Sequence, residues 1–267
     1  MKPSGVITIT TDFGHKGPFA GVMKGVILSR FADAKVVDLA HDIPAQWPPE
    51  AGFWVSRSYA WFPDGTVHLA IVDPGVGTER DILIAEVDGH VFIAPDNGLL
   101  GQLLDNAESP RVFKLVPSRT EALRLPVASA TFHGRDIFAP IAAEIAAGRV
   151  SANELGDEVA TWTPGWIDEP ETADGRISGV IVTIDAFGNL ISNIDASLLE
   201  GFREPVASIG GHQIPMLQTY GRAKPGDLLA LVNSFDVVEV AKAEGSAAEG
   251  LGSDRGAPIV IREGYNT

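Results

Sequence analysis

The sequence predicts an α/β fold, in which an N-terminal α/β sandwich with a largely parallel sheet precedes a smaller C-terminal antiparallel β-barrel. Three observations support this prediction. Apolar strand-like segments alternate with helical patterns through about residue 150, which is the order typical of a parallel sheet. A stretch rich in Pro, Gly, Trp and acidic residues follows at 161–176. From residue 177 onward only short strands and turns are found, which favours a small β domain.

With 267 residues, the chain is long for one domain and comfortable for two. We expect an N-terminal α/β domain at 1–165 and a C-terminal β-barrel domain at 175–267, joined by the Pro-rich and Gly-rich stretch as a linker.

The N-terminal half begins with a buried strand at 6–10, which ends in the loop Thr11-Asp12-Phe13-Gly14. A helix is predicted at 17–30, because five apolar residues recur at helical spacing and share one face: Phe19, Val22, Met23, Val26 and Ile27. Further elements are expected in the following order: a strand at 35–39, a helix at 49–59, a strand at 67–72, a hairpin of 82–87 with 90–94 across Asp88-Gly89, a short helix at 98–104, and a helix at 136–147 that Gly148 stops.

The C-terminal half shows short apolar runs separated by turn residues. We expect strands at 177–184, 190–193, 206–209, 228–232, 237–241 and 258–261.

Composition excludes several classes of protein. The formal net charge is −15, and no cluster of Lys and Arg is present, so nucleic-acid binding is disfavoured. The sequence has no cysteine, which excludes disulfides, zinc-thiolate sites and cysteine nucleophiles. The N-terminal segment lacks a signal-peptide pattern, and no apolar run approaches the length of a membrane-spanning helix. We therefore expect a cytoplasmic protein with no membrane partner.

Two aspartates just past predicted strand ends are the first candidate site residues. Ligands of open α/β sheets bind beyond the carboxyl ends of strands, where Asp12 and Asp73 are expected. Asp73 also begins the turn Asp73-Pro74-Gly75-Val76-Gly77, and Arg80 follows where the chain folds back. The carboxylate and the guanidinium together suit one small polar species. The alternative interpretation is a turn capped by Asp73, with Arg80 on the surface.

Other polar segments allow both a functional and a structural interpretation. His133, in Phe132-His133-Gly134-Arg135-Asp136, suits a general acid or base, while Asp136 suits an N-cap. Four further segments suit either ligand contacts or ordinary turns and loop packing: Ala94-Pro95-Asp96-Asn97-Gly98; Asp185-Ala186-Phe187-Gly188-Asn189; Asn233-Ser234-Phe235 with Glu239 and the turn 245–248; and Trp47 in its Pro-rich loop.

Metal and nucleotide motifs are missing from the sequence. No His-x-x-x-His or His-x-His spacing occurs, and the glycine-rich and P-loop signatures of nucleotide sites are absent. We expect neither a metal nor a cofactor.

Eight segments, spread in order over nearly the whole chain, resemble one family. They are ITTDFG, GPFAGVMKGVI, VDLAHDIP, VHLAIVDPGVGTER, IAPDNGLL, TFHGRDIFAPIAA, VTIDAFGNLISNI and LALVNSFDVVEVAKAEGSAAEGLG. The family is the S-adenosyl-L-methionine (SAM) hydroxide adenosyltransferases, or SAM hydrolases, which are relatives of fluorinase and chlorinase. The resemblance implies hydrolysis of SAM at the ribose C5′ to adenosine and L-methionine, in a homotrimer with each substrate held between neighbouring subunits.

The resemblance also implies roles for individual residues. Asp73, Arg80 and His133 correspond to a catalytic triad that positions the attacking water. Asp12 corresponds to the ribose-diol ligand, Trp47 to an aromatic cover, and Asp185 to the ligand of the methionine amine. Phe187 and Asn189 correspond to the adenine side, with backbone near Ala247, and Ser234 to the ligand of the methionine carboxylate. The halogenases have an arginine where this chain has Phe235, so recognition of the carboxylate is open.

Two other functions stay open at this point. One is a halide-dependent, chlorinase-like adenosyltransferase, although the halogenases lack the triad and carry an extra loop that 97–131 does not show. The other is a SAM-binding or adenosine-binding protein without catalysis.

Overall fold

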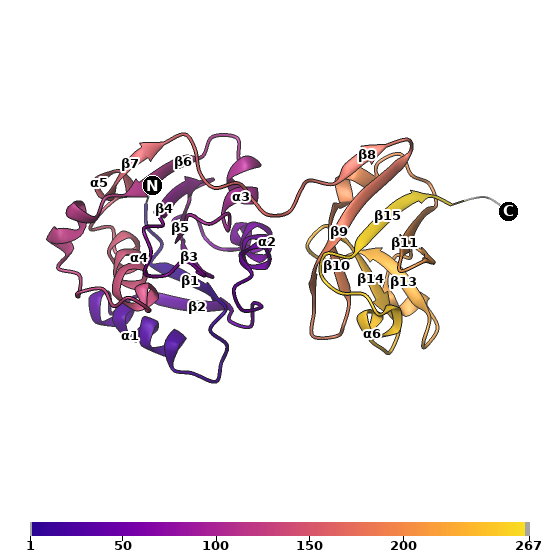
Figure 1. Cartoon of the computed structure of the whole chain (residues 1–267), viewed down its shortest axis with the longest axis horizontal. Coiled ribbons are helices and arrows are strands. Elements are labelled where there is room, and N and C mark those ends of the chain that lie inside the picture. Colours follow the sequence, from indigo (N-terminus) through magenta and orange to yellow (C-terminus); the bar gives the residue numbers. More distant parts are fainter. Residues whose placement is uncertain (1, 265–267) are drawn as a thin grey trace. The chain divides into compact units, whose positions relative to one another are not determined.

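In the computed structural model, which describes residues 2–264, the first part of the chain builds one seven-stranded sheet (Figure 1). The strand order is β2-β1-β3-β5-β4-β6-β7. Pairing is parallel from β2 through β1 and β3 to β5, and antiparallel beyond β5. The strands are β1 (Val6–Thr11), β2 (Lys35–Ala40), β3 (Val67–Ile71), β4 (Ile82–Val87), β5 (His90–Pro95), β6 (Arg111–Leu115) and β7 (Gly156–Val159).

Helices cover both faces of this sheet. Helices α1 and α4 pack in the apolar core on one face, while α2 and α3 pack in the core on the other (Figure 1). The central strand β3 is buried along its whole length, as a strand covered on both faces must be. The helices are α1 (Phe19–Arg30), α2 (Pro48–Ser58), α3 (Gly101–Asp105), α4 (Ala139–Ala146) and α5 (Ala152–Leu155), with short 3-10 turns at Tyr59–Trp61 and Pro117–Leu123.

The second part of the chain forms an antiparallel, nearly closed barrel-like sheet. The strand order is β12-β11-β15-β9-β10-β14-β13, and β8 pairs with β9. The end strands β12 and β13 lie close to each other, as a hydrogen bond from Leu217 N, just after β12, to Ala230 O of β13 at 2.8 Å shows. The strands are β8 (Glu171–Ala173), β9 (Arg176–Ile184), β10 (Leu190–Asp195), β11 (Pro205–Ile209), β12 (His212–Pro215), β13 (Leu228–Val232), β14 (Val237–Lys242) and β15 (Pro258–Glu263); α6 spans Ala247–Leu251, with 3-10 turns at Ala196–Leu199 and Tyr220–Arg222.

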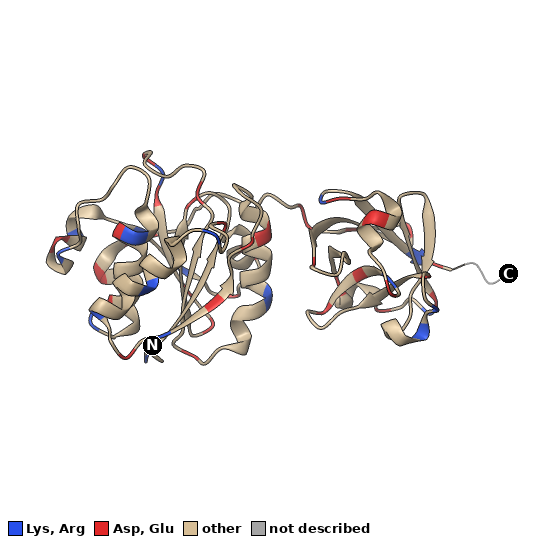
Figure 2. Ribbon diagram, turned by 90° about the horizontal axis from the view of Figure 1, so that it is seen from below, with Lys and Arg blue, Asp and Glu red and all other residues tan. Residues whose placement is uncertain are grey.

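By its contacts the chain divides into two compact units, with the division between Trp166 and Ile167. We call them unit 1 and unit 2. Acidic and basic residues are interspersed over both units rather than gathered on one face (Figure 2).

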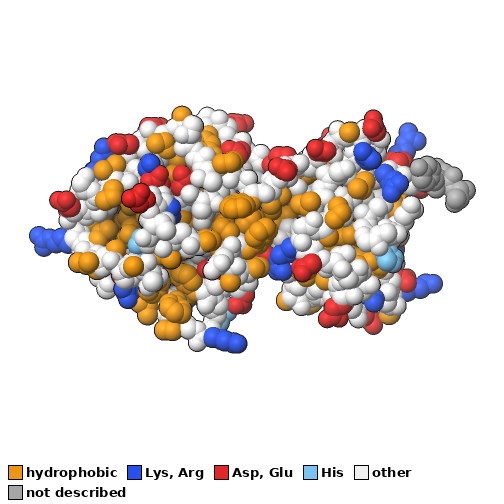
Figure 3. All heavy atoms as spheres, viewed as in Figure 1, with side chains coloured by type: hydrophobic (Ala, Val, Ile, Leu, Met, Phe, Trp, Pro, Cys, Tyr) orange, Lys and Arg blue, Asp and Glu red, His pale blue; other side chains and the backbone are white. Residues whose placement is uncertain are grey.

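The predicted α/β class and the β-rich C-terminal part are confirmed, as is the hairpin across Asp88-Gly89. The predicted buried face of the first helix is partly wrong. Met23 and Ile27 are buried, but Phe19 and Val22 are exposed with Leu28, and Figure 3 shows hydrophobic side chains gathered where α1 lies. Helical spacing shows which residues share a face, but it does not show how much of that face the sheet covers. Phe19 and Val22 lie outside the part of the face that is covered.

Three local predictions differ in part from the structure. The predicted helix at 136–147 begins with a π-helical turn at Gly134–Phe138, so Asp136 lies inside the turn instead of capping it. The predicted linker at 161–176 contains β8, because residues 171–173 find a pairing partner in β9. The predicted turn at 245–248 is the start of α6, where the Ser246 side chain accepts a hydrogen bond from Glu249 N as N-cap.

Candidate functional site

The connections of unit 1 place two aspartates together at one edge of its sheet. Strand β1 has β2 on one side and β3 on the other. The connection after β1 therefore leads toward one edge of the sheet, and the connection after β2 leads back past β1 toward the other edge. Thr11 at the end of β1 pairs with Ile71 at the end of β3, which puts Asp12 and Asp73 just beyond neighbouring carboxyl ends. Such a switch point is where open α/β sheets bind ligands.

Asp73 is held by Arg80. The Arg80 Nε donates to both carboxylate oxygens of Asp73, at 3.0 and 2.9 Å, and Nη2 donates to Oδ2. The two side chains are nearly buried, with exposed fractions of 5% for Asp73 and 10% for Arg80. Because both carboxylate oxygens of Asp73 and two guanidinium nitrogens of Arg80 take part in these hydrogen bonds, the pair is fixed in one orientation.

His133 joins the same cluster through Arg80. The Nη2 of Arg80 lies 3.0 Å from His133 Nδ1. Arginine is only a donor, so Nδ1 must accept this hydrogen bond and the ring proton must be on Nε2. Burial, and then the charge of Arg80, lower the pKa of His133. The imidazole is therefore neutral at pH 7, with an N–H on its outer nitrogen.

Glycines bring the two loops of the cluster into contact. Gly77 has a φ of +79°, and a Cβ there would lie 2.2 Å from Ala130 O, so only glycine allows this approach. The turn after Asp73 is further fixed by Thr78, whose Oγ1 donates to Gly75 O at 2.7 Å. The segment before His133 thus packs directly on the turn after Asp73.

A cavity of about 420 Å³ opens beside Arg80 and His133. Apolar side chains make up much of its wall: Ile82, Leu115, Pro117, Leu125, Pro126 and Ile137. Arg80 and His133 are the members of the cluster that line this cavity, and the other polar lining residues are Thr78, Glu79, Asp81 and Thr120.

Asp12 and Trp47 are also neighbours through their loops. The carboxylate of Asp12 accepts a hydrogen bond from Gln46 N at 2.9 Å, which ties the Asp12 loop to the segment carrying Trp47. His41 supports the Asp12 loop, because its backbone oxygen accepts a hydrogen bond from Gly14 N and its Nδ1 contacts Thr11 Oγ1 at 2.8 Å. Trp47 keeps 39% of its surface exposed, so its ring is free to cover a ligand.

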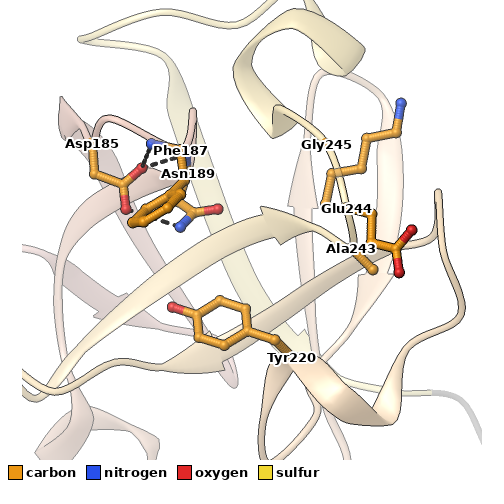
Figure 4. A pocket seen from close by; sticks show the side chains of 8 residues that line it. Asp185, Phe187, Asn189, Tyr220, Ala243, Glu244 and Gly245 are labelled. Carbon is orange, nitrogen blue, oxygen red and sulfur yellow. Dashed lines mark hydrogen bonds between the residues drawn. The ribbon is translucent and has the colours of Figure 1, made fainter.

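Unit 2 holds a second cavity, of about 510 Å³ (Figure 4). Asp185, Phe187 and Asn189 line it from one turn. Asp185 organises this turn, because its carboxylate accepts from Phe187 N, Asn189 N and Asn189 Nδ2, each at 2.9 Å. Phe187 is 79% exposed, which leaves its ring available to a flat ligand.

The opposite side of this cavity includes four residues that the sequence analysis missed as ligand contacts, together with Gly245 of the turn 245–248 that it named. Tyr220 lies across from Asp185 in Figure 4, and Lys242, Ala243, Glu244 and Gly245 complete the lining. Tyr220 donates to Glu239 Oε1 at 2.6 Å, and Asn233 Nδ2 donates to Oε2 at 3.1 Å. Glu239 is only 3% exposed, and burial, together with the charge of Asp185, raises its pKa. The sequence signal for Tyr220 is weak, because only the barrel topology brings it to Asp185.

Two predicted ligands of unit 2 do not line this cavity. Ser234 is exposed in the turn between β13 and β14. Ala247 is fully buried as the first residue of α6, so only backbone near it is available to a ligand. The turn at Gly188 packs on the start of this helix, where Ala248 N donates to Gly188 O at 3.0 Å.

Within residues 2–264, no three His, Asp or Glu side chains gather in a way that could hold a metal ion. No helix in that same range has both the length and the apolar character needed to span a membrane.

The chain matches one family in both units. Residues 7–156 match the SAM hydroxide adenosyltransferase N-terminal domain, and residues 179–260 match the C-terminal domain of that family. The (R)-S-adenosyl-L-methionine hydrolase of Thermus thermophilus is 38% identical over 97% of this chain and 99% of its own length. The protein of the same name from Salinispora tropica is 35% identical over 99% of this chain and 100% of its own length.

A solved structure has the same fold. An uncharacterized conserved protein from Thermotoga maritima superposes with a TM-score of 0.88 at 28% identity, over 96% of this chain and all of that one. The predicted resemblance is confirmed, and the chain belongs to the SAM hydroxide adenosyltransferase family.

Proposed function

We propose that this protein hydrolyses SAM at the ribose C5′. A water oxygen attacks C5′, the bond from C5′ to the sulfonium sulfur breaks, and methionine leaves as a neutral thioether. The products are adenosine, L-methionine and one proton. Since the sulfonium is already a good leaving group, the protein needs to supply an aimed nucleophile rather than a strong acid.

The observation that carries the proposal is the cluster of Asp73, Arg80 and His133. Oδ1 of Asp73 accepts only from Arg80 Nε, whereas Oδ2 accepts from both Nε and Nη2, so the second lone pair of Oδ1 can accept a hydrogen bond from water even while Arg80 holds the carboxylate. His133 Nε2–H can donate to the water oxygen, because Arg80 occupies Nδ1. One donor and one acceptor then orient a single water, and Asp73 is the group that can receive its proton. This arrangement favours electrostatic alignment over general base catalysis by His133.

The substrate contacts divide between the two units. In unit 1, Asp12 would bind the ribose diol and Trp47 would cover the substrate. In unit 2, Asp185 would bind the methionine ammonium, and Phe187 and Asn189 would contact adenine. The Tyr220 ring faces the same cavity and suits the same base. Backbone near Ala247 would bind the purine edge, and Ser234 the carboxylate.

Assembly and location are part of the proposal. We infer a homotrimer in which residues of two subunits complete each site, acting in the cytoplasm. The exposed apolar residues Phe19, Val22 and Leu28 of α1 support association. Refolding a mixture of Asp73→Ala and Asp185→Ala chains should restore part of the activity, whereas no recovery and a monomeric mass by light scattering would reject shared sites.

The decisive experiment incubates the protein with SAM in chloride-free buffer with excess chelator. Because the relatives are named for the (R) form, both sulfonium epimers are supplied separately. We expect adenosine and methionine in equal amounts, one proton released per turnover, and no loss of rate with chelator. A product that carries halide, seen only when chloride or fluoride is added, would indicate a halide-dependent adenosyltransferase. Tight binding without products would indicate a SAM-binding or adenosine-binding protein.

A further inference from the structure

Asn97 connects three parts of unit 1. It follows β5 in the segment Pro95-Asp96-Asn97-Gly98, to which the proposed function assigns no role. Its side-chain Nδ2 donates to Val72 O at 2.8 Å, and its Oδ1 accepts from Leu99 N at 3.2 Å. Its backbone oxygen accepts a hydrogen bond from Trp166 Nε1 at 2.7 Å. The side chain therefore reaches the residue before Asp73, while the backbone is bound to the end of unit 1.

Val72 needs the hydrogen bond that Asn97 supplies. Strands β3 and β5 pair in register only as far as Leu69 with Ile93, and beyond this point they no longer form a ladder. Val72 is fully buried, so its carbonyl group has no water to bind, and a buried carbonyl without a partner is costly. The amide of Asn97 takes the place of a strand partner at the point where the chain turns into Asp73.

The segment 162–166, which we call the strap, is fastened over Asn97. Thr163 N donates to Asp96 Oδ1 at 2.8 Å, and Trp162 Nε1 donates to Asp105 Oδ1 at 3.1 Å. A Cβ on Gly98 would lie 2.5 Å from Pro164 O, and one on Gly101 would lie 2.2 Å from Gly165 N. The two glycines therefore permit a backbone approach that any other residue would block.

Trp166 contributes to the strap mainly through its N–H group. The side chain is 63% exposed, so burial of the ring accounts for little of its placement. Its indole is nevertheless directed at the backbone oxygen of Asn97.

We propose that Asn97 is a positioning residue for the hydrolysis, which sets the place of Asp73 through the Val72 carbonyl, and that the strap holds Asn97 through Trp166. The inference rests on the proposed function, because it assumes that Asp73 orients the water. A small displacement of Asp73 would spoil the alignment of the water with the C5′–S bond without removing any substrate contact. The loss should thus be in kcat and not in KM.

Two tryptophan variants test this proposal as a matched pair. Trp166→Phe and Trp162→Phe each remove one indole N–H from the strap, but only Trp166 is bonded to Asn97. We expect Trp166→Phe to lower kcat about tenfold, which corresponds to a loss of about 1.4 kcal/mol in the transition state, with KM and the unfolding midpoint unchanged. Trp162→Phe should stay within about twofold of the wild type. Asn97→Asp, which removes the donor to Val72 O at constant shape, should reproduce the kcat loss.

A second readout separates the failure of this inference from the failure of the proposed function. The ring signals of His133, assigned by their loss in His133→Asn, report on the cluster by NMR whether or not SAM is turned over. We expect Trp166→Phe and Asn97→Asp to shift these signals, and Trp162→Phe to leave them in place. If Trp166→Phe and Asn97→Asp shift the His133 signals but the wild type does not hydrolyse SAM, the proposed function alone would be refuted. Equal kcat values and unmoved His133 signals in both tryptophan variants would overturn the positioning role.

Discussion

The two candidate sites differ in the groups that surround their aspartates. In unit 1 Arg80 neutralises Asp73 and fixes it, so the cluster of Asp73, Arg80 and His133 has a defined geometry and no net charge. In unit 2 Asp185 is bonded only to neutral amide groups within its own turn, and the carboxyl of Glu239 is close enough for the charge of Asp185 to raise its pKa. The Lys242 ammonium lies beside Gly250.

This difference suggests a division of labour. A neutralised, rigid cluster is suited to aim a small neutral molecule such as water. A pocket with uncompensated negative charge and an exposed aromatic ring is suited to receive a cation that carries a flat base. Substitutions in the cluster of Asp73, Arg80 and His133 should therefore change the chemical step, whereas substitutions in the unit 2 pocket should change binding.

The largest effect is expected in unit 1. Asp73→Ala and His133→Ala each remove one of the two groups that we propose to orient the water, so kcat should fall by about 100- to 10,000-fold. The dissociation constant of SAM, measured by calorimetry, should change by less than about threefold. Parallel loss of SAM binding would place these residues in the binding machinery and would remove the distinction between the two units.

Acid should distinguish the units by stability. His68 of unit 1 is 1% exposed, with its ring nitrogens facing Thr8 and His90, and burial lowers its pKa to about 3. Below about pH 6.5 the unfolded chain binds a proton at this residue and the folded chain does not. The contribution of His68 to the free energy of unfolding is therefore at its full value above pH 6.5 and falls as the pH drops toward 3. The expected loss from His68 is about 2 kcal/mol at pH 5, since each pH unit is worth about 1.4 kcal/mol.

Glu239 of unit 2 should contribute to stability with the opposite sign. Burial raises the pKa of Glu239, so its contribution is present at low pH and is lost as the pH rises above the usual range of a glutamate.

All five tryptophans lie in residues 1–166, so their fluorescence reports on unit 1. Urea unfolding followed by fluorescence should show a lower midpoint at pH 5 than at pH 7, and the difference should shrink in His68→Gln but not in His212→Gln. An unchanged midpoint would show that His68 is not held neutral.

The smallest effect is expected from Asp185→Asn. This change removes the charge of the proposed ammonium ligand but keeps an acceptor for the turn. KM should rise about tenfold with kcat within about twofold, which corresponds to a loss of about 1.4 kcal/mol. Asp195→Asn is the matched control, because Asp195 accepts from Ser197 N in a similar turn that does not line the cavity. A fall in kcat without a rise in KM would contradict the division.

Sequence spacing predicts the unit 1 site better than the unit 2 pocket. Asp73 and Arg80 are close in sequence and belong to one turn, so their pairing could be anticipated from local chain geometry. His133 was a candidate from its own segment, but its grouping with Asp73 and Arg80 came from the family resemblance, since no local pattern connects residues so far apart. Tyr220 and Glu239 reach Asp185 only through the pairing of β10 with β14 and the closure of the barrel, and neither leaves a periodic signal.

The strap shows a different limit of sequence reasoning. Its Pro, Gly and Trp content is typical of a linker, yet the same residues fasten it to Asp96, Asn97 and Asp105. Composition reports low helix and strand propensity, but it does not report where the backbone hydrogen bonds of an irregular segment go.

The central claim is that the cluster in unit 1 aims a water molecule at C5′ of the substrate that unit 2 helps to bind. The most direct test is turnover of SAM in water enriched in heavy oxygen, with mass spectrometry of both products. We predict one heavy oxygen atom in the 5′-hydroxyl of adenosine and none in methionine. Unlabelled adenosine, or label in methionine or in homoserine, would mean that a different bond is broken and would contradict the account.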